Sequence, residues 1–284
     1  MKLQTIVDIA PSAWKIGYDD RILMLGSCFS DSIGQIMTEH YLPVTCNPFG
    51  TLYNPLSIAQ AINYQLPLTN DQLPLVSHDG LWHSMAHHGA FSRASREEAE
   101  AAVRASVESM QKAFQEATVI IVTFGTAWVY EMDGRVVGNC HKLPENCFTR
   151  RRLSVDEIVE TWRPLLAQYP DKHWLFTVSP IRHIRDGLHE NQLSKATLLQ
   201  AVEKLSTEYR IQNTYRISYF PSYEIMLDEL RDYRFYADDL VHPSSMAVNY
   251  IWERFVDAYC TPQTKNELVL QHKRWKHEHH LPLH

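Results

Sequence analysis

The sequence predicts an α/β fold built on a mostly parallel sheet, and two observations lead to this prediction. First, four short runs of almost uniformly apolar residues are typical of strands that are covered on both faces. Second, helical patterns lie between and after these runs, as they do when helices connect parallel strands. The four runs are 22–25 (ILML), 119–124 (VIIVTF), 174–178 (WLFTV) and 216–220 (RISYF).

Four segments carry the pattern of helices. In the clearest one, 96–116, apolar side chains recur along one face of the helix. Ser95 and Glu98 have the spacing of a capping box at its start. Ser154 with Glu157 repeats this box before the second helix. The fourth helix follows directly after Pro243. The predicted helices are 96–116, 158–169, about 193–209 and 244–259.

The rest of the chain is less regular. Segment 41–94 contains many Pro, Asn and His residues and is predicted to form long surface loops. The polar, His-rich segment 261–284 is expected to be a surface arm. Because there is no internal repeat, low-complexity tract or flexible linker, we expect one domain over 1–284, with its core over about 20–260.

The composition bounds the class of protein. The chain has 284 residues, of which 45% are hydrophobic and 21% charged, as in ordinary soluble globular proteins. A formal net charge of −6 gives no general attraction to nucleic acid or anionic lipid, so neither partner is expected. The first twenty residues lack the apolar region of a secretory signal, and no run approaches the roughly 18 apolar residues of a membrane span. We therefore expect a cytoplasmic, soluble protein, whose oligomeric state the sequence does not indicate.

Cysteine and histidine patterns argue against disulfides and metal. The five cysteines are scattered without Cys-x-x-Cys spacing, which predicts reduced thiols. The His-rich stretches 82–88 and 277–280 lack a set of tetrahedral ligands at standard spacing. No glycine-rich phosphate loop such as G-x-x-x-x-G-K is present. We therefore expect no metal and no nucleotide cofactor.

Small polar residues gather where the predicted strands end. The first strand runs into Gly26-Ser27-Cys28, which places two potential nucleophiles side by side, and the second runs into Gly125-Thr126. Ligands bind in open α/β sheets just beyond the carboxyl ends of the strands. This edge of the sheet is therefore the predicted site.

Asp239 and His242 supply a second chemical pattern near the C-terminus. They are three residues apart, so a turn or the start of a helix brings both side chains to one side. A carboxylate in this position orients an imidazole, which can then take a proton from a hydroxyl group. Asp238 is an alternative carboxylate, but the three-residue spacing favours Asp239.

Several long motifs resemble the GSCFA family and, more broadly, the SGNH or GDSL-like hydrolases. The resemblance runs from about residue 20 to 260 and implies a three-layer α/β/α sandwich with a mostly parallel central sheet. It also implies an esterase that cleaves small acyl esters, with acyl groups on carbohydrate as the substrate class and no cofactor. The motifs are GSCFS (26–30), NPFGTLYNP (47–55), NCHKLP (139–144), SPIRH (179–183) and YFPSYEIMLDELRDYRFYADDLVHPS (219–244).

The resemblance also implies roles for individual residues. Ser27 would be the nucleophile, His242 its general base and Asp239 the partner that orients His242. The backbone amides of Ser27 and Gly50 would donate to the oxyanion. The Gly-x-Asn pattern of these hydrolases is absent here, because Gly125 is followed by Thr-Ala-Trp. Substitute donors or substrate-binding groups are expected among Thr126, Asn139, Arg182 and His183.

Three alternatives stay open at the level of sequence. Cys28 is a possible nucleophile in place of Ser27, although successive strand residues point to opposite faces, so at most one of the two faces the site. The resemblance favours Ser27 and places Cys28 in the core. In function, the alternatives are an O-acyltransferase with a sugar acceptor and a non-catalytic carbohydrate-binding protein on the same scaffold.

Overall fold

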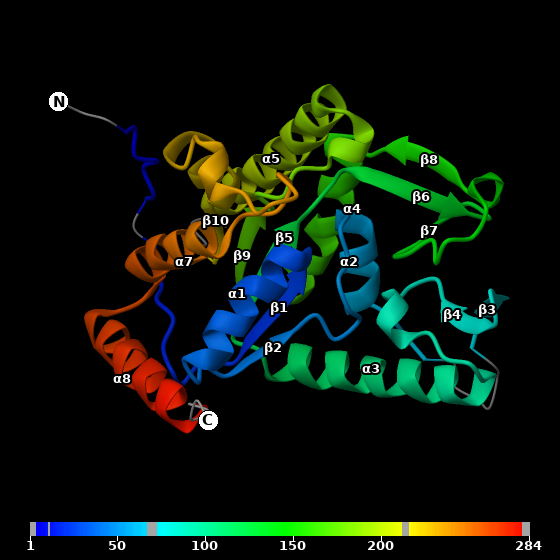
Figure 1. The fold of residues 1–284 in the computed structure, drawn as a ribbon, viewed down its shortest axis with the longest axis horizontal. Coiled ribbons are helices and arrows are strands. Elements are labelled where there is room, and N and C mark those ends of the chain that lie inside the picture. Colours follow the sequence, from blue (N-terminus) through cyan, green and yellow to red (C-terminus); the bar gives the residue numbers. More distant parts are fainter. Residues whose placement is uncertain (1–3, 11, 67–72, 212–215, 280–284) are drawn as a thin grey trace.

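A five-stranded parallel sheet forms the centre of the molecule. The computed structural model describes residues 4–10, 12–66, 73–211 and 216–279. The strand order is β10-β9-β5-β1-β2, and every neighbouring pair is parallel. Helices cover both faces, so the fold is a three-layer α/β/α sandwich, as predicted (Figure 1). The strands are β1 (Ile22–Gly26), β2 (Val44–Cys46), β5 (Val119–Phe124), β9 (His173–Val178) and β10 (Ile217–Phe220).

The four predicted helices are present as α3, α4, α5 and α7. Ser95 caps α3 by accepting from the Glu98 amide, whereas Ser154 and Glu157 form a complete capping box at α4. The helices are α1 (Cys28–Glu39), α2 (Pro55–Ile62), α3 (Arg96–Glu116), α4 (Val155–Gln168), α5 (Leu188–Ile211), α6 (Ser222–Glu224), α7 (Ser245–Tyr259) and α8 (Pro262–Glu278).

The strands are uniformly apolar because each face of the sheet packs against its own core. Leu23 and Leu25 of β1 lie in the cluster that α2, α3, α4 and α5 cover. Ile22 and Met24 point the other way, into the cluster that α1 and α7 cover. This alternation is the period-2 geometry of a strand, hidden in the sequence because both faces are buried.

Segment 41–94 is more ordered than predicted. Besides β2 and α2 it contains the antiparallel hairpin β3 (Leu75–His78) and β4 (Leu81–Ser84). Asp79 and Gly80 form its two-residue turn, both with positive φ (49° and 72°), as this kind of hairpin requires. A second small sheet consists of β6 (Trp128–Met132), β7 (Arg135–Val136) and β8 (Thr149–Arg152). Both small sheets lie on the side of the molecule away from α7 and α8 (Figure 1).

The C-terminal segment is also more regular than the predicted surface arm. Thr261 caps α8 and Pro262 is its first residue, a position where the missing amide costs nothing. Leu268 is buried, and the rings of His40 and His272 stack with centroids 4.3 Å apart. The arm is thus a helix held against the end of α1. The single domain over 1–284 stays a prediction.

All five cysteines are free thiols in the structure. Across the part of the chain that the structure describes, no helix combines the length and the apolar character needed to cross a membrane.

Candidate functional site

The site begins where β1 turns into α1, and Gly26 makes this turn possible. Its φ is +137°, and a Cβ at this position would lie 2.2 Å from the carbonyl oxygen of Thr123 on β5, so no other residue fits. Its amide donates to Oδ1 of Asn47 at 2.8 Å. The chain therefore leaves β1 sharply, and α1 starts at Cys28, only two residues after Gly26.

Ser27 serves as the N-cap of α1. Its side chain accepts from the Phe29 amide at 3.4 Å, and its own amide donates to the carbonyl oxygen of Thr123 at 3.3 Å. The residue is 1% exposed. Within the described residues its hydroxyl forms no hydrogen bond with His242, and its amide is engaged rather than aimed at an oxyanion.

Cys28, the first residue of α1, occupies the position expected for Ser27. Its Sγ lies 3.7 Å from Nε2 of His242, and it is only partly buried. Burial raises the pKa of the thiol, while the amides of Cys28 and Phe29 and the ammonium of Lys195 act in the opposite direction. The expectation that Cys28 packs into the core differs from the structure because both residues lie at a helix start, where strand alternation no longer applies.

Asp239 and His242 are in contact, as their spacing predicts. Oδ2 of Asp239 lies 2.6 Å from Nδ1 of His242, and Oδ1 accepts from the amides of Val241 (2.9 Å) and His242 (3.0 Å). These hydrogen bonds, the backbone ones first, lower the pKa of Asp239 to about 2. Because an ionised carboxylate only accepts, the neutral form of the His242 ring has its proton on Nδ1, and its Nε2 then faces Cys28 with a lone pair.

Arg182 fastens the loop that carries this pair. Its amide donates to the carbonyl oxygen of Val241 at 3.2 Å, and its Nη1 donates to that of Leu240 at 3.1 Å. Leu240 has a φ of +57°, an unusual conformation for leucine, which this double contact helps to hold. The sequence predicted Arg182 as a substrate-binding residue. In the structure it holds the loop of Asp239 and His242, and it also lines a neighbouring pocket.

His183 lies beside the same loop and is half-buried. Its amide donates to Oδ1 of Asn191 at 2.9 Å, and its ring meets that of Tyr53 edge to face at 6.3 Å. Burial, followed by the charge of Lys195, lowers the pKa of His183 to about 4, so the ring is neutral at pH 7. Its Nε2 is buried and has no partner in the described part of the chain.

Three other predicted residues are occupied elsewhere. The Gly50 amide donates to the carbonyl oxygen of Asn47 at 2.7 Å and closes a turn, so it is not free for an oxyanion. The Thr126 hydroxyl lies 3.1 Å from Oγ of Ser194 and accepts from the Trp128 amide. The Asn139 side chain accepts from the His141 amide at 2.8 Å, and its backbone amide donates to the carbonyl oxygen of Met85 at 3.4 Å. None forms a hydrogen bond with Cys28 or His242 among the residues described.

A network around Asp31 was missed at the level of sequence. Its Oδ1 accepts from Nδ2 of Asn47 at 2.7 Å, and its Oδ2 accepts from the Thr51 hydroxyl at 3.1 Å. Asn47 thereby links the Gly26 turn to α1, and it adopts a φ of +45° to do so. The NPFGT motif thus holds the segment that carries Cys28 in place through hydrogen bonds to Gly26 and Asp31. The Asn, Pro and Gly residues of this motif favour turns, and this composition is the sequence signal that could have indicated the network.

Three polar residues of α5 form a second missed group. Asn191, Ser194 and Lys195 are 3%, 1% and 1% exposed. Ser194 accepts from the Ala127 amide at 2.8 Å, and Nζ of Lys195 donates to the carbonyl oxygens of Gly125 and Ser179, both at 2.7 Å. Burial lowers the pKa of Lys195 to about 7. Their i, i+3, i+4 spacing puts them on one helix face, and this spacing was visible in the sequence.

Metal ligands do not gather at this site or elsewhere in the described residues, where no group of three or more His, Cys, Asp or Glu side chains is arranged to hold an ion. His280, part of the second His-rich stretch, lies outside the described residues.

Comparisons with known proteins place the chain by family. No curated protein matches it. Among solved structures, it is similar to a family two carbohydrate esterase from Clostridium thermocellum in complex with cellohexaose, at 12% identity and a TM-score of 0.39. That match covers 89% of this chain but 66%, just under two thirds, of the other. Residues 21–255 match the GSCFA family, so this chain belongs to the GSCFA family.

Proposed function

We propose that this protein is a hydrolase that cleaves acyl esters through Cys28, His242 and Asp239. The observation that carries the proposal is the row of contacts from Sγ of Cys28 to Nε2 of His242 (3.7 Å) and from its Nδ1 to Oδ2 of Asp239 (2.6 Å). A nucleophile, a base and a group that orients the base are the three parts of such a triad. The proposal replaces Ser27 by Cys28 as the nucleophile.

The protonation states suit attack by a thiol that the base activates. Burial raises the pKa of Cys28, so the free enzyme holds S–H rather than a thiolate at neutral pH. Sγ attacks the ester carbonyl carbon as Nε2 of His242 takes the thiol proton. The ester C–O bond then breaks, and His242 returns this proton to the leaving alcohol. Asp239, ionised throughout, stabilises the imidazolium through Nδ1.

The start of α1 supplies the oxyanion donor that the proposal needs. The Cys28 amide has no acceptor within the described residues and belongs to the first helical turn, where amides are unpaired and the helix dipole is positive. A donor aimed at the developing negative charge is typically worth about 3 kcal/mol of barrier. This amide takes the role expected for that of Ser27.

Hydrolysis of the thioester completes the cycle. Water attacks the acyl carbon, His242 takes a proton from the water, and the C–S bond breaks to release acid and thiol. The side chains of His242 and Asp239 are 48% and 49% exposed, so water reaches the base. This exposure favours hydrolysis over acyl transfer to a sugar. That the substrate is a carbohydrate ester stays a prediction from the family resemblance.

The test compares two adjacent substitutions with p-nitrophenyl acetate and butyrate as substrates. Cys28→Ala should lower kcat by about three orders of magnitude or more, because it removes the nucleophile. Ser27→Ala should keep kcat within a few-fold, while it lowers the free energy of unfolding by about 1 kcal/mol through loss of the N-cap. Mass spectrometry of wild type after rapid quenching should show an acyl adduct on Cys28.

The reverse pattern, in which Ser27→Ala is inactive and Cys28→Ala active, would make Ser27 the nucleophile and sink the thiol proposal. Equal turnover by wild type and both variants would place the hydrolysis outside this site altogether. If the three proteins are equally inactive and no adduct forms, the esterase proposal fails for these esters.

A further inference from the structure

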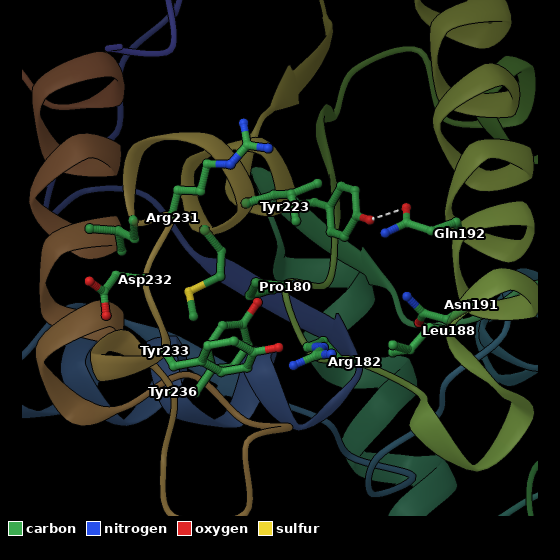
Figure 2. Close-up of a pocket in the computed structure, with 13 residues that line it drawn as sticks. Pro180, Arg182, Leu188, Asn191, Gln192, Tyr223, Arg231, Asp232, Tyr233 and Tyr236 are labelled. Atoms are coloured by element: carbon green, nitrogen blue, oxygen red, sulfur yellow. Dashed lines mark hydrogen bonds between the residues drawn. The ribbon is translucent and has the colours of Figure 1, made fainter. Parts of the chain in front are cut away.

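A pocket of about 270 Å³ lies behind the loop that carries Asp239 and His242. Its walls come from segments 180–192 and 223–236, which lie on either side of it in Figure 2. Neither Cys28 nor His242 lines it, so the pocket is distinct from the proposed triad. The volume is just below the usual range of small-molecule sites, which is about 300–1,000 Å³, and suits a ligand of monosaccharide size.

Arg182 lies at the centre of this pocket as a cation without an anion. Its guanidinium stacks over the rings of Tyr233 and Tyr236, at 5.7 and 5.3 Å from their centroids. One nitrogen, Nη1, is used by the carbonyl oxygen of Leu240. No carboxylate lies within ion-pair distance of the group among the described residues. The remaining N–H donors of its planar fork are therefore free for a ligand, and Figure 2 shows the group between the tyrosine pair and Leu188.

Amide groups of α5 add further donors on the opposite wall. Asn191 is 3% exposed, and its Oδ1 accepts from the His183 amide. Its NH₂ group has no hydrogen-bond partner among the residues that the structure describes. Gln192 accepts from the Tyr223 hydroxyl through Oε1 at 2.7 Å, and its NH₂ group also lacks a partner in the described part of the chain. In Figure 2 both side chains extend from α5 toward the pocket.

Acceptors, by contrast, are engaged. Among the described residues that line the pocket, Asp232 is the only acidic one. Its Oδ1 accepts from the Arg234 amide at 2.9 Å, and its Oδ2 from Nη2 of Arg234 at 2.8 Å. Arg231 at the rim adds a second positive charge, held only loosely by Asp228 at 3.8 Å. The pocket thus presents donors, positive charge and aromatic faces to a ligand.

We infer that this pocket binds a small organic carboxylate, such as a sugar acid. The carboxylate meets the free edge of the Arg182 fork, whose planar geometry matches two carboxylate oxygens, and the Asn191 amide donates to the same group. The body of the ligand packs against the rings of Tyr233 and Tyr236. The inference stands on the pocket alone and does not depend on the proposed hydrolase activity.

Isothermal titration calorimetry on the full chain tests it with three matched sugars. D-glucuronate carries the carboxylate, glucose 6-phosphate carries a phosphate on a similar ring, and glucose carries no charge. Glucuronate should bind at micromolar to millimolar concentration, while glucose should give no heat of binding. Tighter binding of glucose 6-phosphate than of glucuronate would overturn the assignment to carboxylates.

Arg182→Gln should weaken glucuronate binding about tenfold or more, the effect of losing a charged hydrogen-bonding group. Because Arg182 also holds the Leu240 carbonyl, Tyr233→Ala provides a second variant that removes only an exposed stacking face, and it too should weaken binding. The control is Arg185→Gln, since Arg185 is 86% exposed and does not line the pocket. Binding that is absent in wild type, or unchanged in both pocket variants, would overturn the inference.

Discussion

Asp239 has two structural tasks that depend on different atoms. Through Oδ1 it accepts the amides of Val241 and His242 and so shapes the loop. Through Oδ2 it accepts from Nδ1 of His242 and so selects the tautomer that faces Cys28 with a lone pair. A substitution that keeps the first task and removes the second separates folding of the loop from chemistry.

Asp239→Asn is that substitution, because its carbonyl oxygen still accepts the two backbone amides while its NH₂ group cannot accept from Nδ1–H. We expect kcat for p-nitrophenyl acetate to fall by about two to four orders of magnitude. The thermal midpoint should change little. Asp238→Asn is the matched control, with an expected change of less than a few-fold. Full activity of Asp239→Asn would show that the carboxylate does not orient the base.

At the scale of elements, the second turn of α5 joins the strand ends that frame the site. Lys195 bonds to the carbonyl oxygens that follow β5 and β9, and Ser194 bonds to the chain leading into β6. These contacts fix the spacing of Gly125 and Ser179 at the carboxyl edge of the sheet. Burial removes water from the Lys195 ammonium and so disfavours its charged form. For this reason the pKa of Lys195 is lowered to about 7.

This lowered pKa makes stability depend on pH in a defined direction. The unfolded chain holds the Lys195 proton up to about pH 10.4, whereas the folded protein releases it near pH 7. Between these values the unfolded state binds more protons, so the contribution of Lys195 to the free energy of unfolding rises with pH, by at most ~1.4 kcal/mol per pH unit. Below pH 7 the full penalty is present.

Urea unfolding of wild type and Lys195→Met at pH 7, 8 and 9 measures this term. The free energy of unfolding of wild type, minus that of the variant, should grow as the pH rises. Lys204→Met is the control on the same helix, because Lys204 is exposed and pairs with Asp156, and its difference from wild type should stay constant. A wild-type and Lys195→Met difference that is independent of pH would contradict the titration of this lysine.

Elements were easier to predict from the sequence than the contacts between them. Four strands of the central sheet were predicted from their apolar runs, since burial on both faces demands such runs. The edge strand β2 was missed because it has three residues, all partly exposed. The hairpin β3–β4 was missed although its Asp-Gly turn was visible. At Ser27 and Cys28, strand alternation does not apply, because the chain after Gly26 has already become the cap and first residue of helix α1.

At the scale of the whole molecule, the site lies where the order of the sheet reverses. From β1 the chain continues to β2 on one side and later to β5 on the other, so the switch in strand order lies between β1 and β5, next to the residues of the candidate site. The sequence predicted that the site lies at this edge of the sheet. It also predicted the contact between Asp239 and His242. The contacts of Lys195, Asn47 and Arg182 join segments far apart in the chain. Local patterns indicate a turn at Asn47 and a polar helix face at Lys195, but they do not indicate which distant segments these residues contact.

The same arrangement separates α8 from the site. Its contacts, such as the stack of His272 on His40, lie at the C-terminal end of α1, and the family match ends before it at residue 255. Cys28 is at the opposite end of α1, about 18 Å away for a helix of 12 residues. Helix α8 therefore contributes to stability through Leu268 rather than to chemistry.

Removal of residues 262–284 tests this division. Loss of the burial of Leu268 is worth about 2 kcal/mol and should lower the thermal midpoint by roughly 4–8 °C, while kcat for p-nitrophenyl acetate stays within about twofold. Leu268→Ala should reproduce much of the loss, and Leu270→Ala, at a position 60% exposed, should not. A truncated protein that melts cooperatively but has lost its activity would show that α8 acts on the site through α1.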